Sequence, residues 1–262
     1  MLGIELINKC NFKCYFCDSQ YVESHRTLTN SEFFKITDQA KEIGIKYLDL
    51  TPIDGELFMD ETFMEKLEYI LPDFEVTFHT NFSLCNPYII DGLKIFQEKY
   101  DLEIVISDYY SDGLEAFKKL TNKGAQQFLM YQKNLAYAQQ QGLELNIKYR
   151  GLDYGYTIDS SYTVSDIKRT GICSLQYIPS IKMNGDMDYC LCGDGNLTNK
   201  GDLYLGNIYE SSLETVYYSM KRKELFKEQS KDIYNESCSN CDLFETNNIE
   251  MNSLKHYSKM GK

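Results

Sequence analysis

The chain lacks an excess of basic residues, a membrane-length apolar run and an export signal. Its 27 Lys and Arg residues are outnumbered by 39 Asp and Glu residues, which gives a net charge of −12 at pH 7. Proteins that bind nucleic acid or an anionic membrane nonspecifically have the opposite balance, so we expect neither partner. No apolar run approaches the ~20 residues of a membrane span, and no basic segment followed by an apolar stretch opens the chain. We therefore expect a cytoplasmic protein.

Length and composition indicate a globular protein with metal-binding cysteines. The 262 residues are 43% hydrophobic and 25% charged, a balance that argues against disorder. This length allows one large domain, or one large domain and one small one. Nine cysteines without an export signal are more typical of metal ligands than of disulfides, because cytoplasmic thiols are kept reduced.

Helix and strand patterns alternate through the N-terminal part of the chain. The expected strands are Gly3–Ile7, Tyr47–Thr51, Glu75–Thr80, Glu103–Ser107, Gln126–Leu129 and Leu143–Tyr149. The expected helices are Thr29–Ile43, Asp60–Leu71, Tyr88–Tyr100, Ala116–Lys123 and Leu135–Gln141. Such alternation predicts about six βα units and an α/β fold with a parallel sheet.

The composition changes after this alternating region. Gly151–Arg169 is typical of a linker, and the residues beyond it contain many glycines, most of the remaining cysteines and an expected helix over Ser212–Lys227. This change predicts two domains, residues 1–155 and residues 156–262, the second being a small module held together by metal.

Three cysteines follow the first expected strand as Cys-x₃-Cys-x₂-Cys, at Cys10, Cys14 and Cys17. Three thiolates at this spacing can hold three irons of a four-iron cluster, which leaves the fourth iron open to a small chelating molecule. A structural zinc site needs a fourth ligand nearby, and the nearest candidate, His25, is eight residues further on. A zinc knuckle and a buried group of unliganded cysteines are the alternatives.

This run, including Phe16 before the last cysteine, resembles the signature of the radical S-adenosylmethionine (SAM) enzymes. The resemblance implies a partial (β/α)₆ TIM-like barrel in which SAM chelates the open iron of a 4Fe-4S cluster. The reduced cluster splits SAM into methionine and a 5′-deoxyadenosyl radical, which removes a hydrogen atom from the substrate. It also implies an electron donor such as flavodoxin or ferredoxin.

Residues at the ends of the expected strands resemble the SAM-binding positions of this family. The implied cofactor-binding residues are Phe16, Gly55, Glu56, Thr80, Asn81, Ser107 and Asp108. The sequence departs from the family's Gly-Gly-Glu turn at Asp54, from the proline that usually follows at Leu57, and from its Thr-Asn-Gly segment at Phe82. Ordinary βα turns and solvated strand ends are the alternatives for these positions.

The later cysteines resemble those of the auxiliary-cluster modules called SPASM and, in a shorter version, twitch. Shared features are a glycine-to-cysteine strand, a Leu-Gly-Asn-Ile turn and a terminal Cys-x₂-Cys pair. Because four thiolates complete one four-iron cluster, the resemblance assigns one auxiliary 4Fe-4S cluster to Cys173, Cys190, Cys238 and Cys241. A Cys₄ zinc site is the alternative. Three roles stay open for Cys192: a cluster ligand in place of one of these four, a donor of a hydrogen atom to a substrate radical, or a loop cysteine without a specific role. The same ambiguity applies to Cys85.

A fully ligated auxiliary cluster favours an oxidation in which that cluster accepts an electron. The layout resembles the aminoglycoside-pathway dehydrogenase that oxidises a cyclitol alcohol, so we expect a radical SAM oxidoreductase acting on a small polar substrate. The candidate catalytic residues are Cys192, Arg150 and Glu5, with His79 and Asp108 as further candidates for the base.

Three alternatives stay open for the function. One is a redox-neutral epimerase in which Cys192 or Cys85 returns a hydrogen atom. Another is a peptide-crosslinking enzyme, less favoured because the first strand begins at Gly3 and leaves no room for an N-terminal peptide-recognition domain. The third, from a different class, is a noncatalytic zinc or iron–sulfur binding protein.

Overall fold

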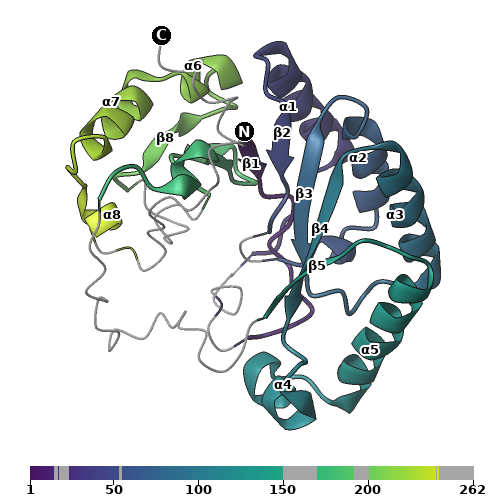
Figure 1. The fold of residues 1–262 in the computed structure, drawn as a ribbon. Coiled ribbons are helices and arrows are strands. Elements are labelled where there is room, and N and C mark those ends of the chain that lie inside the picture. The colour runs from purple at the N-terminus through teal and green to yellow at the C-terminus, as the bar shows by residue number, and fades with distance from the viewer. Residues whose placement is uncertain are drawn as a thin grey trace. The chain divides into compact units, whose positions relative to one another are not determined.

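The computed structural model describes residues 1–14, 17, 24–52, 55–149, 170–191, 201–239 and 241. The chain forms two compact units, shown in Figure 1. The first unit comprises Met1–Tyr162 and Ile181–Asn184, and the second comprises Thr163–Ser180 and Gly185–Lys262. The predicted boundary at residues 155 and 156 lies outside the described residues and stays a prediction. None of the described helices is long and apolar enough to cross a membrane.

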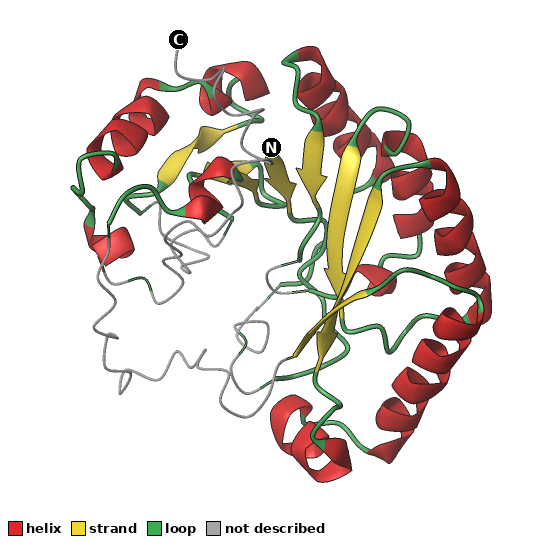
Figure 2. Ribbon diagram, in the orientation of Figure 1, coloured by secondary structure: helices red, strands yellow, loops and turns green. Residues whose placement is uncertain are grey.

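The first unit contains a parallel sheet. Its strands are β1 (Leu2–Ile4), β2 (Tyr47–Asp49), β3 (Glu75–Thr80), β4 (Leu102–Asp108) and β5 (Asn146–Tyr149). They pair in the order β5-β4-β3-β2-β1, and Figure 2 shows β3 and β4 running in the same direction. Consecutive parallel neighbours require a crossover after each strand, as βα units provide. The α/β class predicted from the sequence is confirmed.

Helices connect these strands. They are α1 (Asn30–Glu42), α2 (Phe63–Ile70), α3 (Pro87–Lys99), α4 (Gly113–Thr121) and α5 (Ala125–Gln140), with a short 3₁₀ turn η2 (Leu57–Met59) before α2. In Figure 1, α1, α2, α3 and α5 lie along the same side of the strands. The core between them is apolar and buried, and includes Ile4, Leu48, Val76, Phe78, Ile104 and Ile106.

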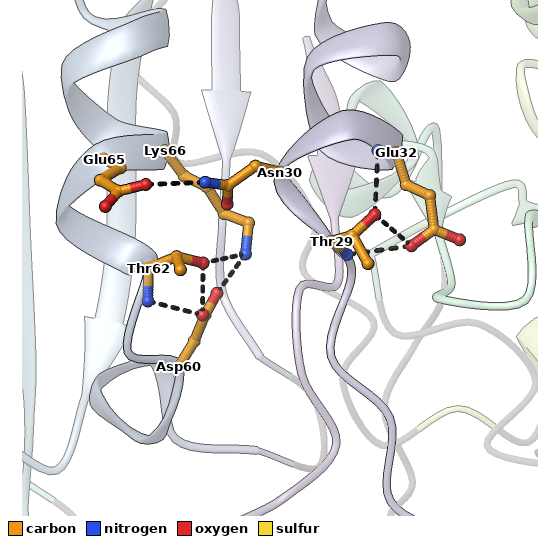
Figure 3. Close-up of polar contacts among 7 residues, drawn as sticks. All are labelled: Thr29, Asn30, Glu32, Asp60, Thr62, Glu65 and Lys66. Atoms are coloured by element: carbon orange, nitrogen blue, oxygen red, sulfur yellow. Dashed lines mark hydrogen bonds and ion pairs between the residues drawn. The ribbon is translucent and has the colours of Figure 1, made fainter.

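Two polar arrangements fix the starts of α1 and α2, and Figure 3 shows both. Thr29 Oγ1 accepts a hydrogen bond from Glu32 N at 3.2 Å, and the Glu32 carboxylate accepts one from Thr29 N at 2.9 Å. This capping box confirms the helix start predicted at Thr29. At the start of α2, the ammonium of the buried Lys66, which lies within the helix, contacts Asp60 at 2.5 Å and Thr62 Oγ1 at 2.9 Å, both of which precede the helix.

The strand predicted over Gln126–Leu129 is wrong. These residues lie inside α5, which runs without a break through Gln140. Helix α5 contains no Val, Ile or Thr, and Ala, Gln, Leu, Met and Lys, all residues with high helix propensity, make up most of it. Among the described residues the first unit therefore has five parallel strands, one fewer than the predicted count.

The second unit combines short strands and short helices. Its elements are η3 (Ser174–Tyr177), β7 (Asp186–Asp188), β8 (Tyr204–Asn207), α6 (Leu213–Tyr217), α7 (Met220–Gln229) and α8 (Glu236–Ser239). The two-residue strand β6 (Ser180–Ile181) spans the boundary, since Ser180 belongs to the second unit and Ile181 to the first. Strands β7 and β8 pair antiparallel. The single helix predicted over Ser212–Lys227 is two helices, because Ser219 has extended backbone and caps α7 through Arg222 N.

Candidate functional site

The first cysteine group lies in the loop after β1, at the carboxyl edge of the parallel sheet. Cys14 is buried, whereas Cys10 and Cys17 are partly buried. Cys17 N donates a hydrogen bond to Cys14 O at 3.1 Å, and Phe12 N donates one to Cys10 Sγ at 3.3 Å. The buried Phe12 ring packs edge-on against Phe117, with 5.6 Å between ring centroids, which anchors the loop to α4.

Cys10 and Cys14 are held in their protonated form when nothing positive is bound. Burial raises the pKa of Cys10 to about 12 and raises the pKa of Cys14 well above its usual range. Cys10 and Cys17 raise the pKa of Cys14 further by charge repulsion, so the three sulfurs are close enough to interact. Because metal coordination deprotonates a thiol, three close thiols in this setting fit an iron–sulfur cluster.

Glu56, in the segment after β2, connects the end of β3 to this loop. Its carboxylate is 1% exposed and accepts hydrogen bonds from Thr80 Oγ1 at 2.6 Å, Asn81 N at 2.7 Å and Phe58 N at 3.3 Å. Its own backbone N donates to Lys9 O at 2.9 Å. Glu56 is therefore hydrogen-bonded both to the end of β3 and to the segment that leads into the first cysteine.

The charge state of Glu56 depends on what lies beside it. Burial raises the pKa of Glu56 from 4.5 to about 7, although the hydrogen bonds from Thr80 and Asn81 act in the opposite direction. A carboxylate can accept about four hydrogen bonds, so three donors leave room for one more. A cationic amine placed there would lower the pKa of Glu56 and keep it ionised. The buried carboxylate thus suits a positively charged ligand group.

Gly55 is required by the packing of the chain on itself. A Cβ atom built at Gly55 would lie 2.0 Å from the backbone oxygen of Ile7. No side chain fits at that distance, so the turn after β2 approaches the segment after β1 as closely as backbones can. The sequence pattern predicts a glycine that makes room for a ligand, and the structure gives this glycine a close backbone neighbour.

An amide network joins Asn81 to the cysteine loop. Asn81 Nδ2 donates to Asn11 Oδ1 at 2.9 Å, Asn11 Nδ2 donates to Ser83 Oγ at 2.8 Å, and Ser83 Oγ donates to Asn81 Oδ1 at 2.6 Å. Tyr110 OH also donates to Asn81 O at 3.2 Å. Sequence reasoning missed Asn11, Ser83 and Tyr110, and only the place of Asn11 inside the cysteine run could have drawn attention to it.

Phe82 follows Asn81 in a left-handed backbone conformation. Its φ is 59°, and its side chain is fully buried. Bulky residues rarely adopt positive φ because the Cβ crowds the backbone. This is the position where the sequence departs from a Thr-Asn-Gly pattern, so the backbone keeps a glycine-like conformation with a phenylalanine in place.

The remaining predicted site residues of the first unit lie in different settings. Asp108, at the end of β4, accepts hydrogen bonds from Tyr110 N at 2.8 Å and Ser111 N at 3.2 Å, so its carboxylate holds its own loop. Ser107 is half-buried. Glu5 is 3% exposed beside β1, and its backbone N donates to Ile181 O at 2.8 Å. The predicted residues Phe16, Arg150 and Cys192 lie outside the described residues.

The second cysteine group lies in the second unit. Cys173 and Cys238 are buried, and Cys190 and Cys241 are partly buried. Cys190 packs against a small core that contains Cys238, and Cys241 N donates to Cys238 O at 3.4 Å. Cys173 and Cys238 approach the same side chain, Gln229, from two different segments.

Among the residues the structure describes, no group of three or more His, Cys, Asp or Glu side chains is arranged to hold a metal ion. In a 4Fe-4S cluster the four cysteines need not converge on one ion, because each binds its own iron. Whether this part of the chain fits a cluster therefore depends on which thiols are present and how they are placed. Cys238 lies in one small core and Cys190 packs against it, while Cys173 contacts Gln229 as Cys238 does; buried or partly buried thiols from these segments fit such a cluster.

Comparison with known proteins identifies this segment. Residues 173–242 match the SPASM family, described as an iron-sulfur cluster-binding domain. The iron–sulfur module predicted from the sequence is confirmed. No curated protein matches the chain.

Solved structures identify the fold of the whole chain. The structure of BtrN in complex with AdoMet and 2-DOIA superposes with a TM-score of 0.60 at 13% identity, covering 95% of this chain and 93% of that one. Native anSMEcpe with bound AdoMet gives 0.63 at 14% identity, covering 93% and 86%. SuiB of Streptococcus suis bound to S-adenosylmethionine gives 0.57 at 16% identity, covering 93% and 70%.

The chain has the fold of these proteins. The resemblance to radical SAM enzymes with a SPASM or twitch module is confirmed by this fold together with the SPASM match. The partial TIM-like barrel followed by an iron–sulfur module, predicted from the sequence, is confirmed as the fold class. The assignments of individual ligands and binding residues stay predictions.

Proposed function

We propose that this protein is a radical SAM enzyme that cleaves SAM reductively and removes a hydrogen atom from a small polar substrate. The observation that carries the proposal is the linkage of the cysteine loop to Glu56 and Asn81 at the carboxyl edge of a parallel sheet. Active sites of parallel βα barrels gather at that edge. The SPASM match over residues 173–242 supports a second cluster in the same chain.

Each part of this edge has a place in the proposed chemistry. The bound cluster and SAM together supply a 5′-deoxyadenosyl radical. Cys10, Cys14 and Cys17 hold the cluster, and the buried Glu56 carboxylate receives the cationic amino group of SAM. Asn81 fixes the loop through Asn11, and by this hydrogen bond it holds the cysteine segment in register with the end of β3.

The reaction proposed for the substrate is dehydrogenation of a sugar or cyclitol alcohol. Oxidation of an alcohol to a ketone removes a hydrogen atom, a proton and one electron. Bound SAM would supply the radical that takes the hydrogen atom, a side chain would take the proton, and an auxiliary cluster held by Cys173, Cys190, Cys238 and Cys241 would take the electron. Among the described residues Glu5, His79 and Asp108 are the candidate bases; Glu5 is a buried carboxyl beside the first strand, whereas the Asp108 carboxylate holds its own loop. Similarity to BtrN in complex with AdoMet and 2-DOIA supports a small-molecule substrate.

Peptide modification is the second candidate. Native anSMEcpe with bound AdoMet and the Kp18Cys peptide superposes with a TM-score of 0.58 at 14% identity and covers 93% of this chain. A peptide substrate is therefore compatible with this fold. An epimerase would instead need a thiol that returns hydrogen, and Cys85, one of its two predicted donors, is only 2% exposed.

The test is an anaerobic incubation of the reconstituted protein with SAM, dithionite and separate panels of amino sugars, cyclitols and cysteine-containing peptides. Production of 5′-deoxyadenosine that rises with a cyclitol or sugar, together with a ketone product, is the expected result. Deuterium gained from D₂O at a carbon of an unoxidised product would indicate epimerisation instead. Stimulation by peptides alone would replace the small-molecule substrate with a peptide.

A further inference from the structure

Gln229 is a buried amide that contacts two of the four predicted auxiliary-cluster ligands. It is the last residue of α7 and only 2% exposed. Its Nε2 donates a hydrogen bond to Cys238 Sγ at 3.1 Å, and its Oε1 accepts one from Cys173 N at 3.5 Å. A backbone N–H can only donate, so the oxygen must face Cys173 and the NH₂ group must face the sulfur of Cys238.

Other side chains already hold the same segments together. Asp232 Oδ1 accepts a hydrogen bond from Gly171 N at 2.6 Å, and Tyr234 OH donates one to Gly171 O at 2.9 Å. Asn235 Oδ1 accepts from Cys238 N at 2.8 Å, which fixes the start of α8. These bonds position the backbone before Cys173 and at Cys238 without involving a sulfur atom. Gln229 differs from them because it donates to a sulfur.

A hydrogen bond to a ligand sulfur changes how readily a cluster is reduced. Reduction adds one negative charge to the cluster, part of which resides on the cysteine sulfurs. A donor aimed at such a sulfur stabilises the reduced form more than the oxidised form, so it raises the reduction potential. In a buried site this effect is less screened by solvent than at the surface.

We propose that Gln229 is a positioning residue that raises the reduction potential of the auxiliary cluster held by Cys173, Cys190, Cys238 and Cys241. The proposal rests on the proposed function, since it requires that cluster. In the proposed dehydrogenation the auxiliary cluster accepts one electron from the substrate after the hydrogen atom and proton have left. A higher reduction potential makes this acceptance more favourable. This role would explain why the polar amide of Gln229 is buried beside Cys238.

The experiment isolates the auxiliary cluster in a Cys10/Cys14/Cys17→Ala background and follows its reduction by potentiometric titration with electron paramagnetic resonance detection. Gln229→Met removes the donor but keeps the length of the side chain, and Gln229→Glu replaces the donor with a carboxylate. Tyr234→Phe is the matched control, because it removes the bond from Tyr234 OH to Gly171 O between the same segments and leaves the bond from Gln229 to Cys238 Sγ in place. Iron is counted in every variant.

The midpoint potential is expected to fall in Gln229→Met, to fall further in Gln229→Glu, and to stay at the parent value in Tyr234→Phe. A parent-like potential in an iron-loaded Gln229→Met variant would overturn the proposal. Loss of iron from both Gln229 variants but not from Tyr234→Phe would also overturn it, because Gln229 would then only hold the ligands in place. Absence of iron from the parent background would instead remove the auxiliary cluster from the proposed function.

Discussion

Thr80 Oγ1 donates a 2.6 Å hydrogen bond to Glu56 Oε1, and this bond joins the carboxyl end of β3 to the segment that follows β2, its parallel neighbour. The same hydroxyl accepts a hydrogen bond from Phe82 N at 2.9 Å. One side chain thus orients a buried carboxylate and the loop that contains Asn81. The two residues are 24 positions apart in sequence, so the contact depends on the parallel pairing of β2 with β3.

Replacing Thr80 with Val keeps the shape of the side chain and removes both hydrogen bonds. The Glu56 carboxylate loses its shortest donor, so we expect the unfolding free energy to fall by about 1–3 kcal/mol. We also expect slower SAM cleavage by the reconstituted protein. Denaturant titration and 5′-deoxyadenosine assays measure the two effects.

Thr37→Val is the matched control for this change. Thr37 is equally buried, but its hydroxyl bonds to backbone oxygens within α1, away from Glu56. It is expected to affect stability without slowing cleavage by the folded protein. Equal loss of cleavage in both variants would contradict a specific role for Thr80.

Glu56 predicts a particular pH dependence in the cluster-free protein. Burial raises the pKa of Glu56 from 4.5 to about 7 in the folded chain, so the folded state binds more protons than the unfolded state between these values. Its contribution to stability is therefore complete below pH 4.5 and declines as the pH rises towards about 7. Glu56→Gln should flatten this part of the profile. Parallel profiles for the two proteins in urea titrations between pH 5 and 8 would contradict the prediction.

The buried ion pair of Lys66 and Asp60 is expected to dominate the stability of the turn before α2 (Figure 3). Lys66→Met leaves the Asp60 charge buried without its partner, which costs about 3–5 kcal/mol. Lys41→Met, which removes the partner of Asp73 in an exposed ion pair, is the control and should cost about 0–1 kcal/mol. Chemical denaturation of both variants checks the difference, and similar losses would show that the burial of Lys66 does not matter.

At Phe82 we expect the glycine variant to be more stable than the alanine variant, the reverse of what is expected at an ordinary buried strand position. Its φ of 59° is costly for any residue with a Cβ, so Phe82→Gly should be less destabilising than Phe82→Ala, although both lose the buried ring. Phe78, which is equally buried in β3, provides the comparison. There Phe78→Gly should be the more destabilising change, because glycine weakens a strand. The same order at both positions would show that strain at Phe82 is negligible.

Much of the fold follows from local patterns in the sequence. Glu75–Thr80 is a strand over the predicted residues, because its Val and Phe side chains alternate with polar ones and a turn precedes it. The capping box at Thr29 also depends only on neighbouring residues. The strand prediction for Gln126–Leu129 is wrong because these four residues continue the helical sequence on both sides of them.

The site is less predictable than the fold. Cysteine spacing marks its location, but the bonds that shape it connect residues far apart in the chain, such as Asn11 and Asn81. Gly55 shows the same limit, since its close neighbour is the oxygen of Ile7. Local sequence gives no sign of either contact, because both arise from the order of strands in the sheet.

The most direct test of the account compares the anaerobically reconstituted protein with a Cys10/Cys14/Cys17→Ala variant. Iron, sulfide and 5′-deoxyadenosine are measured, with Cys85→Ala as a control for loss of a buried cysteine outside both groups. Two clusters predict about eight irons in the native chain, about four in the triple variant, and cleavage of SAM only when the first three cysteines are present. Zinc in place of iron, with no cleavage of SAM by the native chain, would contradict the enzyme proposed here.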